Sequence, residues 1–270
     1  MLRAPHTKYA RIYTYHINGR GIGPIDDLDL IGTWEEDGKT ILIFHTDKHR
    51  LVEKLCRRKG LHLFYRADLA YEDWEMGCEI APFTVGHLTV APVWDPGEAD
   101  IKIDPSVVFG NGFHPSTRLC LEALSRYRPR LPKRFTGLDL GCGTGLLAIG
   151  AAKLGASSVT AADHNSLACA VTKQNAAYNE VGGSILVKHL DLRVELPPAN
   201  VDVIMANLHH ELLGELFHNP SFWQAGMYIL SGFMPGGEEH LLAALPGKPP
   251  PFLERRGMAK WRVWVLGSNQ

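Results

Sequence analysis

The spacing of apolar and polar positions changes along this chain, and its second part shows a regular alternation. After Pro132, short apolar runs of β-forming residues alternate with stretches whose apolar residues recur at helical spacing. Strands that alternate with helices predict a parallel sheet with helices on both faces. The expected strands are 137–140, 158–162, 185–189, 201–206 and 227–233, and the expected helices are 146–154 and 166–179.

Two further elements flank this pattern. Pro115-Ser116-Thr117 is typical of a helix start, and the apolar residues behind it share one helical face. Residues 261–266 alternate between apolar and polar positions and follow Gly257. We therefore expect the sheet to end in a hairpin with its turn at Gly257.

The first part of the chain predicts a small α+β unit. Residues 11–17 are rich in β formers, and 30–34 and 40–44 flank the turn cluster 35–38, which indicates a hairpin. Residues 48–59 carry apolar residues at helical spacing and stop at Gly60. Less regular segments follow, which predict a strand at 61–65, a short helix at 72–75 and a strand at 85–91.

The length supports two parts. At roughly 150 residues per domain, 270 residues predict one large domain with a smaller companion. We place the boundary between residues 92 and 93, which gives a small α+β domain with its linker over 1–92 and a catalytic domain over 93–270.

Composition excludes several classes of partner. The 28 Lys and Arg against 29 Asp and Glu give a formal charge of −1, which argues against a protein that coats nucleic acid. No apolar run approaches the ~18 residues that a membrane span needs, and the start has no signal-peptide pattern. The five cysteines form no C-x-x-C, so we expect reduced thiols in a cytoplasmic protein. No set of histidines and cysteines shows metal-ligand spacing, so we expect no metal site.

A glycine-rich turn between an expected strand and helix is the main chemical signal. Residues 138–145 read L-D-L-G-C-G-T-G, and such a turn in an open α/β sheet is where ligands bind. The dinucleotide fingerprint G-x-G-x-x-G requires a glycine at 146, where this chain has Leu146. Asp139 would repel a pyrophosphate by about 3 kcal/mol at roughly 6 Å. The same carboxylate would attract the ammonium and sulfonium of S-adenosylmethionine.

Two more acids follow expected strands. Asp163, 24 residues past Asp139, ends the second strand, where an acid can accept hydrogen bonds from both ribose hydroxyls. The alternative is that it caps the next helix. Asp191 follows the third strand and could meet the adenine amino group, or could be a loop residue.

Three further segments stand beside the glycine-rich loop with Asp163: Phe109-Gly110-Asn111-Gly112-Phe113-His114-Pro115-Ser116-Thr117, Asp202 to Leu208 (D-V-I-M-A-N-L), and Leu230-Ser231-Gly232. On these four segments the chain resembles the ribosomal protein L11 methyltransferase family. Segment 109–117 is unusual among methyltransferases and is the most specific. The match spans most of residues 83–266.

The resemblance implies an α/β fold of the Rossmann-like class I methyltransferase type, with a seven-stranded sheet and a small N-terminal α+β domain that grips the protein substrate. It implies S-adenosylmethionine as cofactor. The positions that match cofactor contacts are Thr117, Gly141, Asp163 and Asn207, to which the loop argument adds Asp139 and Gly143.

Asn207 is the candidate catalytic residue. Only about one in a thousand lysine amines is neutral at pH 7, and a desolvated slot favours that form. Asn207 could hold such an amine through its side-chain carbonyl. The chain departs from the family pattern at Asn111, Phe113 and Ser116, and at His209-His210, where small or apolar residues are common.

The remaining candidates have ordinary explanations beside the functional ones. His209 and His210 could be bases or solvated surface residues. His114 could line the pocket, and Cys142 fits a small buried thiol.

The resulting expectation is a methyltransferase acting on lysine or α-amino nitrogen of a protein, with a ribosomal protein as the candidate substrate. The alternatives are another protein or a small molecule as acceptor, a relative that binds cofactor without catalysis, and a nicotinamide oxidoreductase.

Overall fold

The computed structural model describes residues 11–267 apart from 24, 28, 37, 71–80 and 113. It divides into two compact units. Of the described residues, the first unit holds those up to 70 together with 93–96 and 165–167, and the second holds 81–92, 97–164 and 168–267. Residues 81–92 therefore group with the second unit, whereas the sequence-based boundary assigned them to the first.

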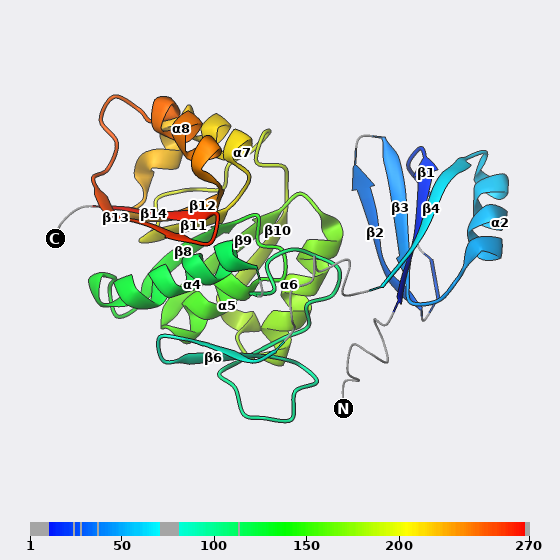
Figure 1. The fold of residues 1–270 in the computed structure, drawn as a ribbon, viewed down its shortest axis with the longest axis horizontal. Coiled ribbons are helices and arrows are strands. Elements are labelled where there is room, and N and C mark those ends of the chain that lie inside the picture. The colour runs from blue at the N-terminus through cyan, green and yellow to red at the C-terminus, as the bar shows by residue number, and fades with distance from the viewer. Residues whose placement is uncertain are drawn as a thin grey trace. The chain divides into compact units, whose positions relative to one another are not determined.

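The second unit is built around the predicted seven-stranded sheet (Figure 1). Its strand order is β10-β9-β8-β11-β12-β14-β13. The strands from β10 to β12 run parallel, and β14 and β13 close the sheet as an antiparallel hairpin. The bounds are β8 Phe135–Leu140, β9 Ala156–Asp163, β10 Ile185–His189, β11 Val203–Asn207, β12 Met227–Phe233, β13 Phe252–Met258 and β14 Trp261–Gly267.

Helices cover both faces of this sheet, as the alternating pattern predicted. Figure 1 shows α4 and α5 on one side and α7 and α8 on the other. The apolar residues of α7 and α8 pack on alternate residues of β8, β11, β12 and β14, which form one continuous core. The bounds are α4 Pro115–Tyr127, α5 Leu146–Lys153, α6 Ser166–Tyr178, α7 His210–Phe217 and α8 Pro235–Ala244, with short 3-10 turns at Arg128–Arg130, Gly182–Ser184 and Pro220–Gln224.

A small three-stranded sheet belongs to the same unit and corrects one expectation. It orders β5 (Phe83–Val85), β6 (Leu88–Pro92) and β7 (Ile101–Ile103). The single strand expected at 85–91 is wrong, because a turn at Gly86 and His87 folds β5 back on β6. Strand β7 was not predicted, since three residues carry too little periodicity.

The first unit is a four-stranded sheet with one helix, close to the prediction. Its order is β2-β3-β1-β4, all antiparallel. Helix α2 ends at Gly60, which has the predicted left-handed conformation (φ 64°). Val52 and Cys56 of α2 pack against Tyr15, Ile17, Leu42 and Phe44 of the sheet. The bounds are β1 Arg11–Asn18, β2 Leu30–Glu36, β3 Lys39–Phe44, α2 His49–Lys59 and β4 His62–Ala70.

Three other expectations can be compared with these bounds. The turn expected at Gly257 is wrong: β13 continues to Met258, and the turn lies at Ala259 and Lys260, where Ala259 has φ 51°. The last strand of the first unit is longer than the 61–65 expected. The short helix expected at 72–75 lies outside the described residues.

Candidate active site

The candidate site lies where the strand order reverses. Strand β8 is flanked by β9 on one side and by β11 on the other: the chain runs from β8 outward to β9 and β10, then crosses back to place β11 on the opposite side of β8. In open α/β sheets, ligands bind beyond the carboxyl ends of the strands at this point. The glycine-rich loop begins there, directly after Leu140.

Positive φ angles shape this loop. Gly141 has φ 73° and Gly143 has φ 53°, a conformation that side chains other than glycine rarely adopt. A Cβ on Gly143 would lie 2.0 Å from the carbonyl oxygen of Phe109, so a side chain cannot be placed there without moving backbone. The N–H groups of Gly141 and Cys142 both donate to the carbonyl of Ala162, at 2.8 and 3.1 Å. The loop is therefore fixed against the end of β9.

The segment that carried the most specific resemblance lies against this loop. The Thr144 N–H donates to the carbonyl of Phe109 at 2.9 Å, and the Thr144 hydroxyl donates to the carbonyl of Gly110 at 2.6 Å. The Asn175 side chain, fully buried in α6, donates to the Thr144 carbonyl at 2.9 Å. Residues 34 positions apart in the sequence thus form one local structure.

Asp163 joins the second strand to the loop. It ends β9, is buried, and its Oδ2 accepts a hydrogen bond from the Gly143 N–H at 3.0 Å. Its Oδ1 lies 3.6 Å from Nδ1 of His164. The carboxylate therefore lies beside the glycine-rich loop.

Asp139 is the most buried acid of the site. Its side chain is 1% exposed, and its Oδ2 accepts from the Ala148 N–H in the first turn of α5 at 3.1 Å. Its Oδ1 has no hydrogen-bond partner within the described part of the chain. The pKa of Asp139 is raised to about 7: burial raises it most, the bond from Ala148 lowers it, and the neighbouring charge of Asp163 raises it. The bond to Ala148 was not predicted from sequence.

Asn207 and Thr117 meet across ninety residues of sequence. Asn207 ends β11, and its Nδ2 donates to Oγ1 of Thr117 in the first turn of α4 at 3.0 Å. Its Oδ1 is buried and has no hydrogen-bond partner among the described residues. A buried amide oxygen without a partner is unfavourable in the isolated protein, and such atoms often mark a ligand site.

Comparisons with known proteins now bear on this geometry. The family model described as ribosomal protein L11 methyltransferase matches residues 34–265. A ribosomal protein L11 methyltransferase from Geobacter metallireducens is 32% identical, over 96% of this chain and 93% of that relative. One from Syntrophotalea carbinolica is 36% identical over 68% of this chain and 61% of that relative. The chain belongs to the ribosomal protein L11 methyltransferase family.

A solved structure supports the same assignment. The crystal structure of a ribosomal protein L11 methylase from Lactobacillus delbrueckii subsp. bulgaricus superposes with a TM-score of 0.58 and 25% identity, covering 70% of this chain and 100% of that chain. Members of the family are S-adenosylmethionine-dependent protein methyltransferases. The sequence-based prediction of family, fold class and cofactor is confirmed.

The site of this family member fits that cofactor on the structure's own terms. Asp139 and Asn207 each hold a buried oxygen without a partner in the described residues, and they lie at the carboxyl ends of the adjacent strands β8 and β11. An anionic oxygen suits a ligand that carries an ammonium and a sulfonium. Glycine at position 141 lets the loop pass close to Leu208, because a Cβ on Gly141 would lie 2.4 Å from the Leu208 side chain.

His114 lies in an aromatic cluster and has a structural task. It precedes α4, and its Nδ1 lies 2.7 Å from the Ser116 hydroxyl. Its ring contacts those of Phe109 and Trp261, with centroids at 4.9 and 4.5 Å. Burial lowers the pKa of His114, and the charge of Lys260 lowers it further, so the ring is held neutral.

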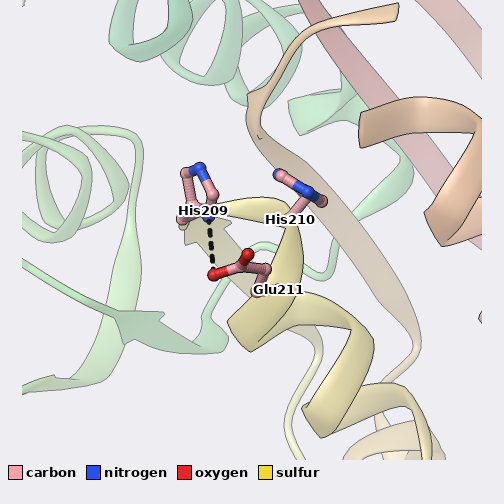
Figure 2. A group of neighbouring side chains, drawn as sticks. All are labelled: His209, His210 and Glu211. Atoms are coloured by element: carbon pink, nitrogen blue, oxygen red, sulfur yellow. Dashed lines mark ion pairs between the residues drawn. The ribbon is translucent and has the colours of Figure 1, made fainter. Parts of the chain in front are cut away.

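The other candidates lie in less specific surroundings. Asp191 Oδ1 accepts from the Arg193 N–H at 2.9 Å, which matches the loop role left open for it. Burial raises the pKa of the Cys142 thiol well above its usual value, which keeps it protonated and unreactive. Phe113 lies outside the described residues. Figure 2 shows His209 and His210 at the start of α7 beside Glu211.

Within the part of the chain that the structure describes, no helix is both long and apolar enough to cross a membrane.

Proposed function

We propose that this chain transfers methyl groups from S-adenosylmethionine to an amino nitrogen of a protein, with ribosomal protein L11 as the first candidate substrate. The observation that carries the proposal is the Asn207–Thr117 pair, whose unpartnered amide oxygen lies at the carboxyl end of β11. The curated relatives bear the name of that ribosomal protein. A cytoplasmic location agrees with such a substrate.

Six residues would hold the cofactor in this proposal. Asp163 offers its carboxylate to ribose hydroxyls, Asp139 offers negative charge to the cationic part, and the glycine-rich loop allows close approach of backbone. Thr117 fixes the orientation of Asn207 through the 3.0 Å hydrogen bond. The full set is Thr117, Asp139, Gly141, Gly143, Asp163 and Asn207. When bound, S-adenosylmethionine supplies an electrophilic methyl group on a sulfonium.

The chain's own contribution to transfer is orientation and desolvation. Methyl transfer is an in-line displacement, in which correct placement of the nucleophile can remove much of the barrier. The Asn207 amide oxygen would accept a hydrogen bond from the acceptor amine and direct its lone pair. Burial of the slot would favour the neutral amine, because desolvation disfavours the ammonium.

The first unit would select the protein substrate. Strand β4 lies at the edge of its sheet and exposes two large aromatic side chains, Phe64 at 43% and Tyr65 at 56%. Both contact the ring of His16, at 6.1 and 5.1 Å between centroids. Exposed aromatic residues are enriched at protein interfaces, which makes this strand the expected docking face.

The test combines binding and transfer. Calorimetry should show binding of S-adenosylmethionine and none of NAD; binding of NAD alone would contradict the proposal. Incubation with methyl-labelled cofactor and purified ribosomal protein L11 should label that protein. Label on another protein or on a small molecule would reassign the acceptor, and no label on any species in a cell extract would indicate a relative that binds cofactor without catalysis.

A matched pair of variants assigns the role of Asn207. Asn207→Ala should abolish most of the labelling while the protein remains folded. Asn200→Ala removes an exposed asparagine just before the same strand and should leave labelling unchanged. Full activity of Asn207→Ala would remove this residue from the mechanism.

A further inference from the structure

A cluster of metal-binding side chains lies at the start of α7, outside the residues assigned to methyl transfer. His209, His210 and Glu211 each place one ligand atom within 4.8 Å of the other two. Figure 2 shows the His209 ring and the Glu211 carboxylate facing each other, with the His210 ring beside them. The distance from His209 Nδ1 to Glu211 Oε2 is 3.6 Å.

We propose that these three side chains bind a divalent transition metal such as Zn²⁺, with water completing the coordination. Two imidazoles and one carboxylate form a donor set that Zn²⁺ uses in sites that keep an open position. Imidazole ligands favour Zn²⁺, Ni²⁺ and Cu²⁺ over Mg²⁺ and Ca²⁺, which prefer all-oxygen sites. The occupant is therefore a borderline metal and not a hard cation.

The side chains can close on a metal without rearranging the fold. Tetrahedral ligands at a Zn–N distance near 2.1 Å lie about 3.4 Å from one another. The His209 and Glu211 side chains are 65% and 78% exposed, so small rotations can bring their atoms from the observed separations to that value. The His209 and His210 rings are already close, with centroids 4.3 Å apart.

The surroundings supply both a supporting and an opposing feature. A third imidazole, His240 of α8, stacks on His210 with centroids 5.7 Å apart, so several imidazoles gather at one place. The N-terminus of α7 carries a partial positive charge, which opposes a cation. Glu211 in the first turn offsets that charge, and we therefore expect binding of moderate strength.

The experiment measures metal binding on the full chain, free of any histidine tag. Titration with Zn²⁺ by calorimetry should give one saturable site, and Co²⁺ should give visible absorption bands typical of nitrogen and oxygen ligands. Excess Mg²⁺ should not displace either metal. Thiolate charge-transfer bands with Co²⁺ would place the metal on cysteine and overturn the proposal.

Variants tie the binding to this cluster. His209→Ala and His210→Ala should each weaken Zn²⁺ binding by at least about tenfold, because even outer-shell partners are worth that much at metal sites. His218→Ala removes an exposed histidine at the other end of α7 and should change nothing. Unchanged binding in the His209→Ala/His210→Ala double variant, or no saturable binding in the parent, would overturn the proposal. Neither readout depends on methyl transfer, so failure of the metal proposal can be distinguished from failure of the proposed function.

Discussion

The two units of this molecule place their distinctive polar and aromatic residues in opposite ways. In the second unit, polar side chains are buried at the carboxyl edge of the sheet, among them Asp139, Asp163 and Thr117. In the first unit, the core beneath α2 is largely apolar, and its distinctive groups, Phe64 and Tyr65, face solvent. One unit has the features of a site for a small ligand, and the other has those of a surface for a macromolecule.

The difference teaches what each unit tolerates. A buried carboxyl group costs free energy unless a ligand or a proton compensates it, which is why the pKa of Asp139 is raised to about 7. An exposed aromatic side chain costs little in the free protein and contributes only when a partner covers it. Substitutions in the site of the second unit should therefore affect cofactor binding and folding. Substitutions on β4 should affect only the binding of the protein substrate.

The largest effect is expected from Gly143→Ala. The new Cβ would lie 2.0 Å from the Phe109 carbonyl oxygen, and Gly143 has positive φ, so the loop and the segment over it must separate. We expect loss of measurable S-adenosylmethionine binding in calorimetry and a lower melting temperature. Gly182→Ala is the control, because no atom lies within 4 Å of a Cβ built there. Normal affinity in Gly143→Ala would show that the two segments need not touch.

Asp163→Ala should have the next largest effect. It removes a buried acceptor of the Gly143 N–H and the proposed partner of the ribose hydroxyls. We expect cofactor affinity to fall by about 1–3 kcal/mol, as measured by calorimetry. Asp26→Ala, at an exposed position in the first unit, should be neutral. Unchanged affinity in Asp163→Ala would leave this acid with a structural role only.

Most strands, the glycine-rich loop and Asp163 could be predicted from the sequence, whereas several contacts within the site could not. The strands 185–189 and 227–233 were predicted with their observed bounds, because each begins with apolar β-forming residues shortly after a glycine. The glycine-rich loop and Asp163 carry local signals as well. By contrast, the contact between Asn207 and Thr117 arises from the packing of α4 beside β11. The Asp139–Ala148 hydrogen bond arises because the first turn of α5 packs against the end of β8. Such partners depend on tertiary register, which no local pattern contains.

The pH dependence of cofactor binding should reveal Asp139. A cationic ligand binds best to the ionised carboxylate, so affinity should fall as pH drops below about 7, by at most about tenfold per pH unit. A free α-amino group titrates near pH 8, so the ligand's own ammonium stays charged in that window. Calorimetry from pH 5.5 to 7.5 should show that S-adenosylmethionine affinity rises with pH in the parent and changes less with pH in Asp139→Asn. Equal slopes would assign the titration elsewhere.

In the protein without ligand, the ionisation of Asp139 lowers the folding stability, whereas it favours cofactor binding. Its folded pKa lies above the usual 3.8, so the folded state holds a proton that the unfolded state releases. Its contribution to stability is thus largest at low pH and is lost as pH rises from about 4 to about 7. Denaturant titrations across this range should show that loss in the parent and a smaller one in Asp139→Asn.

The smallest effect should come from the exposed strand of the first unit. Phe64→Ala combined with Tyr65→Ala should raise KM for the protein substrate, on the order of fivefold for each kcal/mol of binding free energy that the two rings supply, with kcat and S-adenosylmethionine affinity unchanged. Leu186→Ala is the matched control, since Leu186 is an equally exposed apolar residue (56%) on β10 of the second unit. A fall in cofactor affinity in the aromatic double variant would contradict the assignment of cofactor binding to the second unit alone. A rise in KM for Leu186→Ala as large as for the aromatic pair would show that exposure of apolar surface, wherever it lies, and not strand β4 in particular, governs recognition.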